Sequence, residues 1–145
     1  MNARIASAAV AATVFDVVYG FLVYGMLLSG QFSAYPAVYR SAETGPGYLP
    51  LMFCGILIAM VAAAMIYAKG YEGGSGVSEG ARFGVLLGIF VATAFSGVNY
   101  AVLNIGRRLA VATAAAGFVE WVLVGIVIGL VYKPAAGSGR KAVGV

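Results

Sequence analysis

Hydrophobic positions form four long runs along the chain, at residues 5–28, 49–68, 78–103 and 109–132, with shorter polar breaks between them. A helix rises about 1.5 Å per residue, so each run is long enough to cross the roughly 30 Å hydrocarbon core of a bilayer. The second run contains no charged residue and ends at Lys69 and Gly70, a typical helix stop. The pattern predicts an all-α integral membrane protein, a four-transmembrane-helix up-down bundle that forms a single domain over residues 1–145.

The first run has a competing interpretation as a cleavable signal peptide, because Arg4 gives the chain a basic start. A signal peptide has a short apolar core, whereas residues 5–28 are long and carry Asp16 near their centre. We therefore expect this helix to be retained in the membrane.

Two segments outside the runs have a distinct composition. The connection at residues 29–48 contains Phe32, Tyr35, Tyr39 and Tyr48, side chains that suit the headgroup level of a bilayer. We expect this connection to face outward. Residues 133–145 form a short basic tail, which we expect in the cytoplasm.

Polar residues also mark the start of the third run. The Ser78 hydroxyl is the expected N-cap, and Glu79 follows in the first turn, where a negative charge favours the helix dipole. Arg82 stands three residues after Glu79, so we expect the two side chains to pair.

The composition agrees with a membrane location. Hydrophobic residues make up 62% of the chain and charged residues 10%, with no histidine and one cysteine, Cys54. Soluble domains have roughly 45–50% apolar and about 25% charged residues, so the composition excludes a soluble enzyme. Without histidine, and with a single thiol, we expect no metal site, no haem or redox cofactor and no disulfide within one chain.

The distribution of basic residues predicts the partners and the orientation. The net charge is +4, and the cations are scattered without interleaved aromatic residues, which favours anionic membrane lipids over nucleic acid as a partner. With four spans both termini share one side of the membrane, and the side richer in Lys and Arg is the cytoplasmic one. The terminal side has Arg4, Lys69, Arg82, Lys133, Arg140 and Lys141, against Arg40, Arg107 and Arg108 on the other. We therefore expect a plasma (inner) membrane protein with both termini cytoplasmic.

Small residues recur about every four positions on three of the predicted helices. This spacing lets helix backbones approach closely in lipid. The expected packing residues are Gly20 in the first run, Gly80, Gly84 and Gly88 in the third, and Gly125 and Gly129 in the fourth. We expect these faces to join the helices of one chain, with a homodimer interface as the alternative.

Two acidic residues, Asp16 and Glu120, fall beside the midpoints of the first and fourth runs. At that depth an ionised aspartate costs roughly 2.5–3.5 kcal/mol. The first and last helices of an up-down bundle are antiparallel neighbours, so the two acids are expected to meet at the same height. No Lys or Arg lies in the interior of any run to pair with them. The acids are then protonated and hydrogen-bonded, share one proton, or bind an external cation.

Three further residues are candidates for the same site. Tyr19 and Trp121 are close in sequence to the acids, and Asn99 lies in the part of the third run that we place toward the outer face. Tyrosine and asparagine in a span also serve as packing residues and interhelical hydrogen-bond partners. In the purely structural alternative, sealed protonated acids are satisfied by Thr13, Tyr19 or backbone carbonyls.

These features support three functional hypotheses. The leading one is a small proton- or cation-coupled transporter or channel that uses Asp16 and Glu120. The alternative is a non-catalytic membrane subunit or assembly factor that docks a larger partner through its small-residue faces, with the acids meeting a basic residue of that partner. A membrane enzyme acting on lipid or quinone ranks third, because no histidine or nucleophile accompanies the carboxyl groups. We therefore expect no enzymatic activity.

Overall fold

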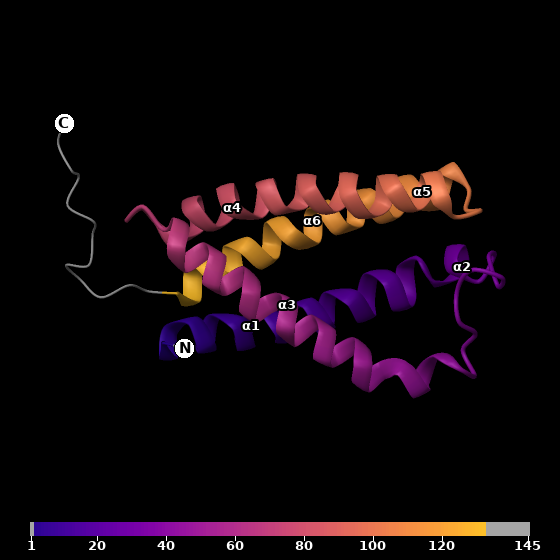
Figure 1. Cartoon of the computed structure of the whole chain (residues 1–145), viewed down its shortest axis with the longest axis horizontal. Coiled ribbons are helices and arrows are strands. Elements are labelled where there is room, and N and C mark those ends of the chain that lie inside the picture. The colour runs from indigo at the N-terminus through magenta and orange to yellow at the C-terminus, as the bar shows by residue number, and fades with distance from the viewer. Residues whose placement is uncertain (1, 133–145) are drawn as a thin grey trace.

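The computed structural model describes residues 2–132, which form four long helical rods, Ala3–Leu27, Gly45–Gly70, Gly76–Val102 and Arg107–Val131 (Figure 1). Each rod is long and apolar enough to cross a membrane. Their ends lie within two residues of the hydrophobic runs, apart from the turn that precedes the second rod. The basic tail at residues 133–145 lies outside the described residues.

The rods are not uniform helices. The first consists of α1 (Ala3–Gly20) and a π-helical continuation, η1 (Phe21–Leu27), and is followed by the short α2 (Ser29–Phe32). The second begins with a 3₁₀ turn, η2 (Gly45–Tyr48), and continues as α3 (Leu49–Gly70). In the third, a π-helical segment, η3 (Ala92–Gly97), separates α4 (Gly76–Val91) from α5 (Val98–Val102). The fourth is a single helix, α6 (Arg107–Val131).

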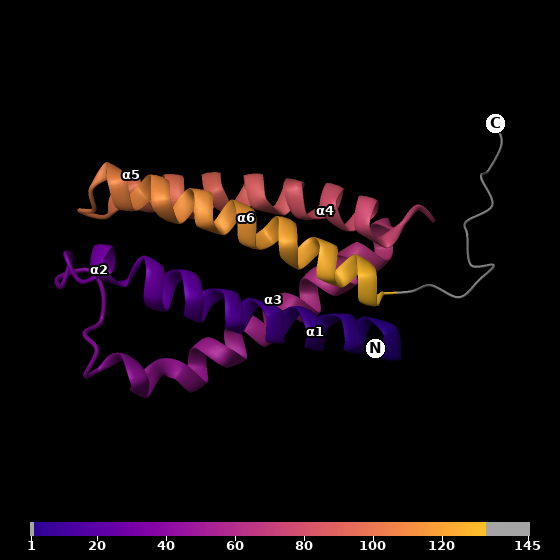
Figure 2. The same ribbon diagram turned by 180° about the vertical axis from the view of Figure 1, so that it is seen from behind.

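The helices contact one another in the order α3, α1, α6, α4. The start of α1 and the end of α6 lie at one end of the molecule, and the connections after η1 and after α5 lie at the other (Figures 1 and 2). The contact between α1 and α6 makes the first and last rods neighbours, as is needed for Asp16 and Glu120 to meet. Because α4 packs almost entirely on α6, the helices form an open row and leave much of α4 exposed.

The contact between α4 and α6 is a backbone contact made by glycines. A Cβ atom built on Gly84 would lie 2.5 Å from the carbonyl oxygen of Trp121, and Cβ atoms on Gly80 and Gly125 would also strike backbone atoms of the facing helix. These small residues thus pack within the chain. Gly20 makes no such contact in the described residues, where a Cβ atom built on it would meet only the ring of Tyr24 on its own rod, at 4.0 Å.

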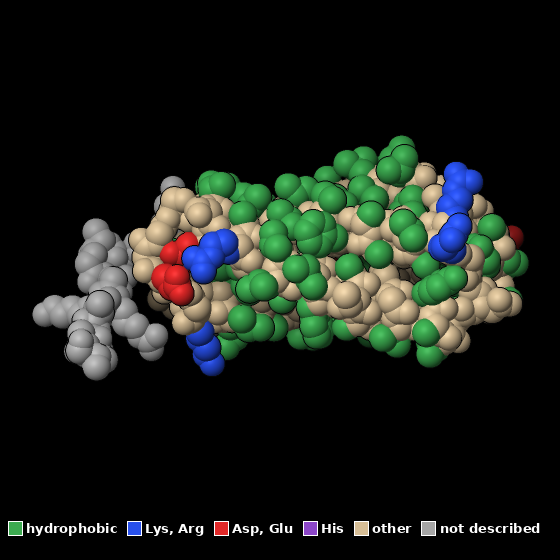
Figure 3. All heavy atoms as spheres, turned by 90° about the horizontal axis from the view of Figure 1, so that it is seen from above, with side chains coloured by type: hydrophobic (Ala, Val, Ile, Leu, Met, Phe, Trp, Pro, Cys, Tyr) green, Lys and Arg blue, Asp and Glu red, His purple; other side chains and the backbone are tan. Residues whose placement is uncertain are grey.

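Small side chains also bring α1 close to α3. Ala8, Ala9 and Ala12 are fully buried against α3 and α6. The rest of this core comes from α3 (Met60, Ala63, Ala64, Tyr67) and α6 (Val124, Ile128). Large apolar side chains instead cover the outside of the rods, while Lys and Arg gather near the two ends (Figure 3). This surface suits a lipid environment between two aqueous ends.

The connection at residues 33–44 folds over the start of α6. Tyr35 and Tyr39 pack against Ile105 and Leu109, and the hydroxyl of Tyr35 accepts a hydrogen bond of 2.9 Å from the amide of Gly106. Burial raises the pKa of Tyr39, and neighbouring Tyr35 raises it further. The aromatic residues of this connection thus close one end of the helix row.

The start of the third rod differs from the sequence-based expectation. Ser75, rather than Ser78, is the N-cap, and its hydroxyl accepts a hydrogen bond from the amide of Ser78. Glu79 turns back to accept from the amides of Glu72 and Gly74, so Arg82 pairs with Glu72 instead, at 3.4 Å. The glycine-rich connection thus supplies the backbone amides that bind the Glu79 carboxylate.

Candidate functional site

Asp16 and Glu120 lie at matching depths on the contacting helices α1 and α6. Asp16 is residue 14 of the 25-residue rod Ala3–Leu27, and Glu120 is residue 14 of the 25-residue rod Arg107–Val131. Two antiparallel helices therefore place both side chains about one residue from their common midpoint. Both residues are buried, with 9% of Asp16 and 8% of Glu120 exposed.

The two carboxyl groups are within hydrogen-bonding reach of each other. The hydroxyl of Tyr24 also donates a 2.8 Å hydrogen bond to Oε2 of Glu120. An ionised carboxylate only accepts hydrogen bonds, so a bond between the two acids requires a proton on one of them. The arrangement is thus a carboxyl pair able to share one proton, with a tyrosine holding Glu120 in place.

Tyr24 reaches Glu120 because the first rod changes its helical repeat after Gly20. In an α-helix, four residues turn about 40° more than a full turn, so positions four apart drift by that angle around the axis. The π-helical segment Phe21–Leu27 has more residues per turn, so the step from Gly20 to Tyr24 falls short of a full turn and reverses that drift. Asp16 and Tyr24 consequently lie on nearly the same line of the rod.

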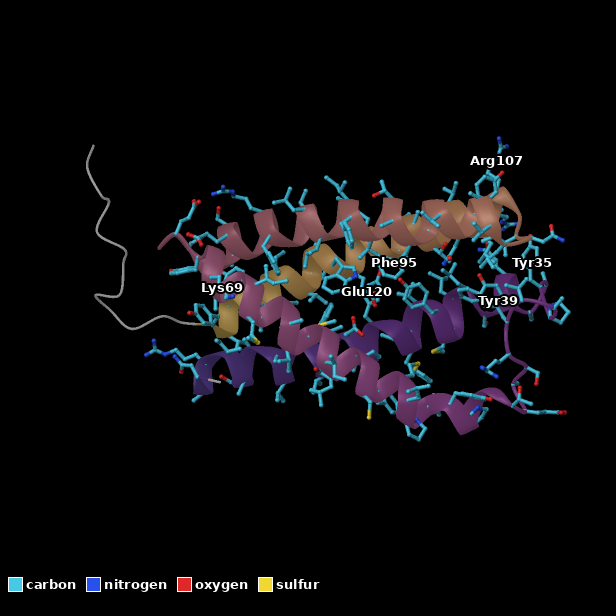
Figure 4. The ribbon with its side chains drawn as sticks, viewed as in Figure 1. Tyr35, Tyr39, Lys69, Phe95, Arg107 and Glu120 are labelled. Carbon is cyan, nitrogen blue, oxygen red and sulfur yellow. The ribbon has the colours of Figure 1, made fainter. Side chains whose placement is uncertain are left out.

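Within residues 2–132 neither acid forms a salt bridge. The ion pair in this part of the chain joins Glu72 and Arg82, which are exposed. Lys69 and Arg107 lie toward opposite ends of the molecule, whereas Glu120 lies near its middle (Figure 4). The carboxyl pair therefore has no internal counter-charge among the described residues.

A cavity of about 800 Å³ adjoins the acids. It lies between η1 and α3, in the half of the molecule nearer α2, and both Asp16 and Glu120 form part of its wall. The remaining wall is apolar and aromatic apart from Tyr24, and includes Phe21, Phe32 and Phe53. The polar groups are thus confined to one end of an otherwise apolar space.

The other candidate residues have different surroundings. The hydroxyl of Tyr19 donates to the carbonyl of Ala116 at 2.9 Å, which ties α1 to α6 beside the acids. Trp121 packs against the core formed by α1, α3 and α6 and does not line the cavity. Asn99 is exposed on α5 and does not line the cavity either. The structure therefore brings together Asp16, Glu120 and Tyr19, and leaves Trp121 and Asn99 out.

Sequence reasoning gave no site role to Tyr24, which contacts Glu120 directly. The sequence signal for Tyr24 is its spacing of four residues from Gly20 and eight from Asp16, which places the three residues on one side of a helix. Thr13 was a candidate hydrogen-bond partner of the acids if their role is purely structural. Its hydroxyl instead donates to the carbonyl of Ala9 in its own helix.

Compared with known protein families, curated proteins and solved structures, the chain matches none. The site must therefore be interpreted from its own geometry.

Proposed function

We propose that the protein is a small proton- or cation-coupled transporter or channel that uses Asp16 and Glu120 as its binding centre. In this proposal the four rods span the plasma (inner) membrane with up-down topology and cytoplasmic termini. The observation that carries it is the pair of buried, contacting carboxyl groups without a basic partner in residues 2–132. An ionisable side chain at that depth is costly, which points to a functional role.

The surroundings of the two acids support different roles for them in this proposal. Tyr24 and the contact with α1 hold Glu120 in a fixed position on α6. Both acids border the cavity, but Asp16 has no hydroxyl or amide donor among the described residues, so it is the acid better placed to exchange a proton or receive a cation. Exchange at Asp16 alters the net charge of the carboxyl pair. This charge interacts strongly with neighbouring groups where water is excluded, because the local dielectric constant is low.

Flux measurements in proteoliposomes test the proposal. Asp16→Asn and Glu120→Gln keep the side-chain shape and remove the exchangeable charge, so each is expected to lower pH-gradient-driven proton flux at least tenfold. Glu72→Gln removes one carboxylate from an exposed ion pair and serves as the matched control, with wild-type flux expected. Wild-type flux in the Asp16→Asn, Glu120→Gln double variant would overturn the proposal.

Infrared spectroscopy adds a measurement that does not depend on transport. A carboxyl C=O band that is absent from the Asp16→Asn or Glu120→Gln protein should change in intensity between about pH 5 and pH 9 if the pair exchanges protons with water. Bands that stay constant over this range would identify sealed structural acids and contradict the proposal.

The second candidate is a docking subunit or assembly factor of a larger membrane complex. The exposed side of α4 favours it, since this helix packs almost entirely on α6 and presents Leu86, Ile89 and Phe90 outward. Extraction in a mild detergent followed by size analysis distinguishes the two. A particle the size of this chain alone, with no co-purifying protein, would argue against the docking role.

A further inference from the structure

We infer that the cavity between η1 and α3 binds a lipophilic organic monocation, with the Asp16 and Glu120 pair as its counter-ion. This inference rests on the proposed function and names its substrate class.

The size and position of the cavity suit a small organic molecule. Its volume of about 800 Å³ falls within the roughly 300–1,000 Å³ typical of small-molecule sites. Leu22 and Met52, on the two helices that form its walls, are 51% and 47% exposed, so the space opens sideways between η1 and α3. In a membrane this opening faces lipid, and a ligand dissolved in the bilayer can enter without crossing an aqueous channel.

The charge at the inner end of the cavity selects a cation. If the carboxyl pair shares one proton, it carries a single negative charge, which one positive charge on a ligand neutralises. The titratable groups around Asp16 are Glu120 on α6 and Tyr19 and Tyr24 on its own rod. The wall contributed by α3, which includes Met52, Phe53 and Ile56, contains no titratable group. A neutral ligand would leave the charge uncompensated in an apolar site.

The cavity wall favours an organic cation over a metal ion. Four aromatic side chains line it, namely Phe21, Tyr24, Phe32 and Phe53, and aromatic faces attract cations from which water has been removed. Hard metal ions need several oxygen ligands. Residues 2–132 contain no group of three or more His, Cys, Asp or Glu side chains arranged to hold a metal. A bulky cation with its charge spread over apolar groups fits both the acidic end and the aromatic wall.

Binding of tetraphenylphosphonium to the purified full-length protein in detergent, followed by equilibrium dialysis, tests the inference. Gly25→Leu places an apolar side chain in the cavity wall without altering either acid, whereas Gly55→Leu makes the same change at an open position on α3 outside the cavity. We expect at least tenfold weaker binding in Gly25→Leu and in Asp16→Asn, and wild-type binding in Gly55→Leu. Protons should compete with the cation, so binding should weaken at low pH.

Three results would overturn the inference: no saturable binding, wild-type affinity in Gly25→Leu and Asp16→Asn, or equal binding of the uncharged analogue tetraphenylmethane. Proton flux distinguishes this failure from failure of the proposed function. Flux that depends on Asp16 without any tetraphenylphosphonium binding refutes the cation site alone. Asp16-dependent binding without flux supports the cation site and refutes coupled transport.

Discussion

The glycine contact between α4 and α6 makes a quantitative prediction for Gly84→Ala. A Cβ atom at this position would lie 2.5 Å from the carbonyl oxygen of Trp121 and 2.7 Å from Cα of Val122. The first distance is 0.9 Å short of the 3.4 Å at which ordinary contact begins. Both neighbours are backbone atoms of a helix, which cannot move aside as a flexible side chain can. The two helices must therefore separate by nearly 1 Å.

The magnitude follows from overpacking. Inserting a methyl group into a tightly packed contact costs about 1–3 kcal/mol. Replacing glycine by alanine within a helix also contributes a favourable change of up to about 1 kcal/mol from helix propensity. Gly55→Ala on α3 shares this second contribution, because Gly55 is a helical glycine whose Cβ would meet nothing within 4 Å. The difference between the two variants thus isolates the clash, at about 1–3 kcal/mol.

Unfolding by sodium dodecyl sulfate in mixed micelles, followed by circular dichroism, measures this difference. The backbone carbonyl of Trp121, the single tryptophan of the chain, lies at the contact, so the fluorescence of its indole reports independently on a displacement of α6. We expect Gly84→Ala to unfold at lower detergent fractions than Gly55→Ala, with a shifted emission maximum. Equal stability of the two variants would refute the close backbone approach of α4 and α6.

Three further predictions concern single side chains. Tyr24→Phe removes the hydrogen bond to Glu120 and should lower the free energy of unfolding by roughly 0.6–1.7 kcal/mol. Tyr100→Phe, at an exposed position, should leave it unchanged, and equal losses in the two variants would count against the contact between Tyr24 and Glu120. Tyr35→Phe leaves the amide of Gly106 without its hydrogen-bond partner. Hydrogen exchange at this amide should be roughly fivefold faster, which corresponds to about 1 kcal/mol, and an unchanged rate would contradict the hydrogen bond between Gly106 and Tyr35. Met60→Ala leaves a cavity at a fully buried position and should lower the free energy of unfolding by roughly 2–5 kcal/mol. Met65→Ala, at an exposed position, should lower it by less than about 0.5 kcal/mol, and a similarly small loss at Met60 would show that the core is not packed as described.

The local chemistry of the chain was sufficient to locate the helices. Each rod is a long apolar segment, and a helix closes its own backbone hydrogen bonds, so the position of each rod along the chain depends on local composition rather than on contacts with distant residues. The small-residue spacing also identified the α4 and α6 faces correctly, since only glycine permits backbones to touch. Gly20 has the same spacing but makes no close helix contact in the described residues, because a small residue allows close approach without causing it.

The details of the site needed the tertiary structure. The sequence determined that two acids lie near mid-span without an internal basic partner, because span limits and charge positions are local properties. The contact between α1 and α6 was expected from the order of the spans, but the reversal of helical drift in η1 that brings Tyr24 to Glu120 and the cavity beside α3 depend on how distant helices pack. Packing angles and helical irregularities arise from many weak contacts between separate segments, and no single stretch of sequence encodes them.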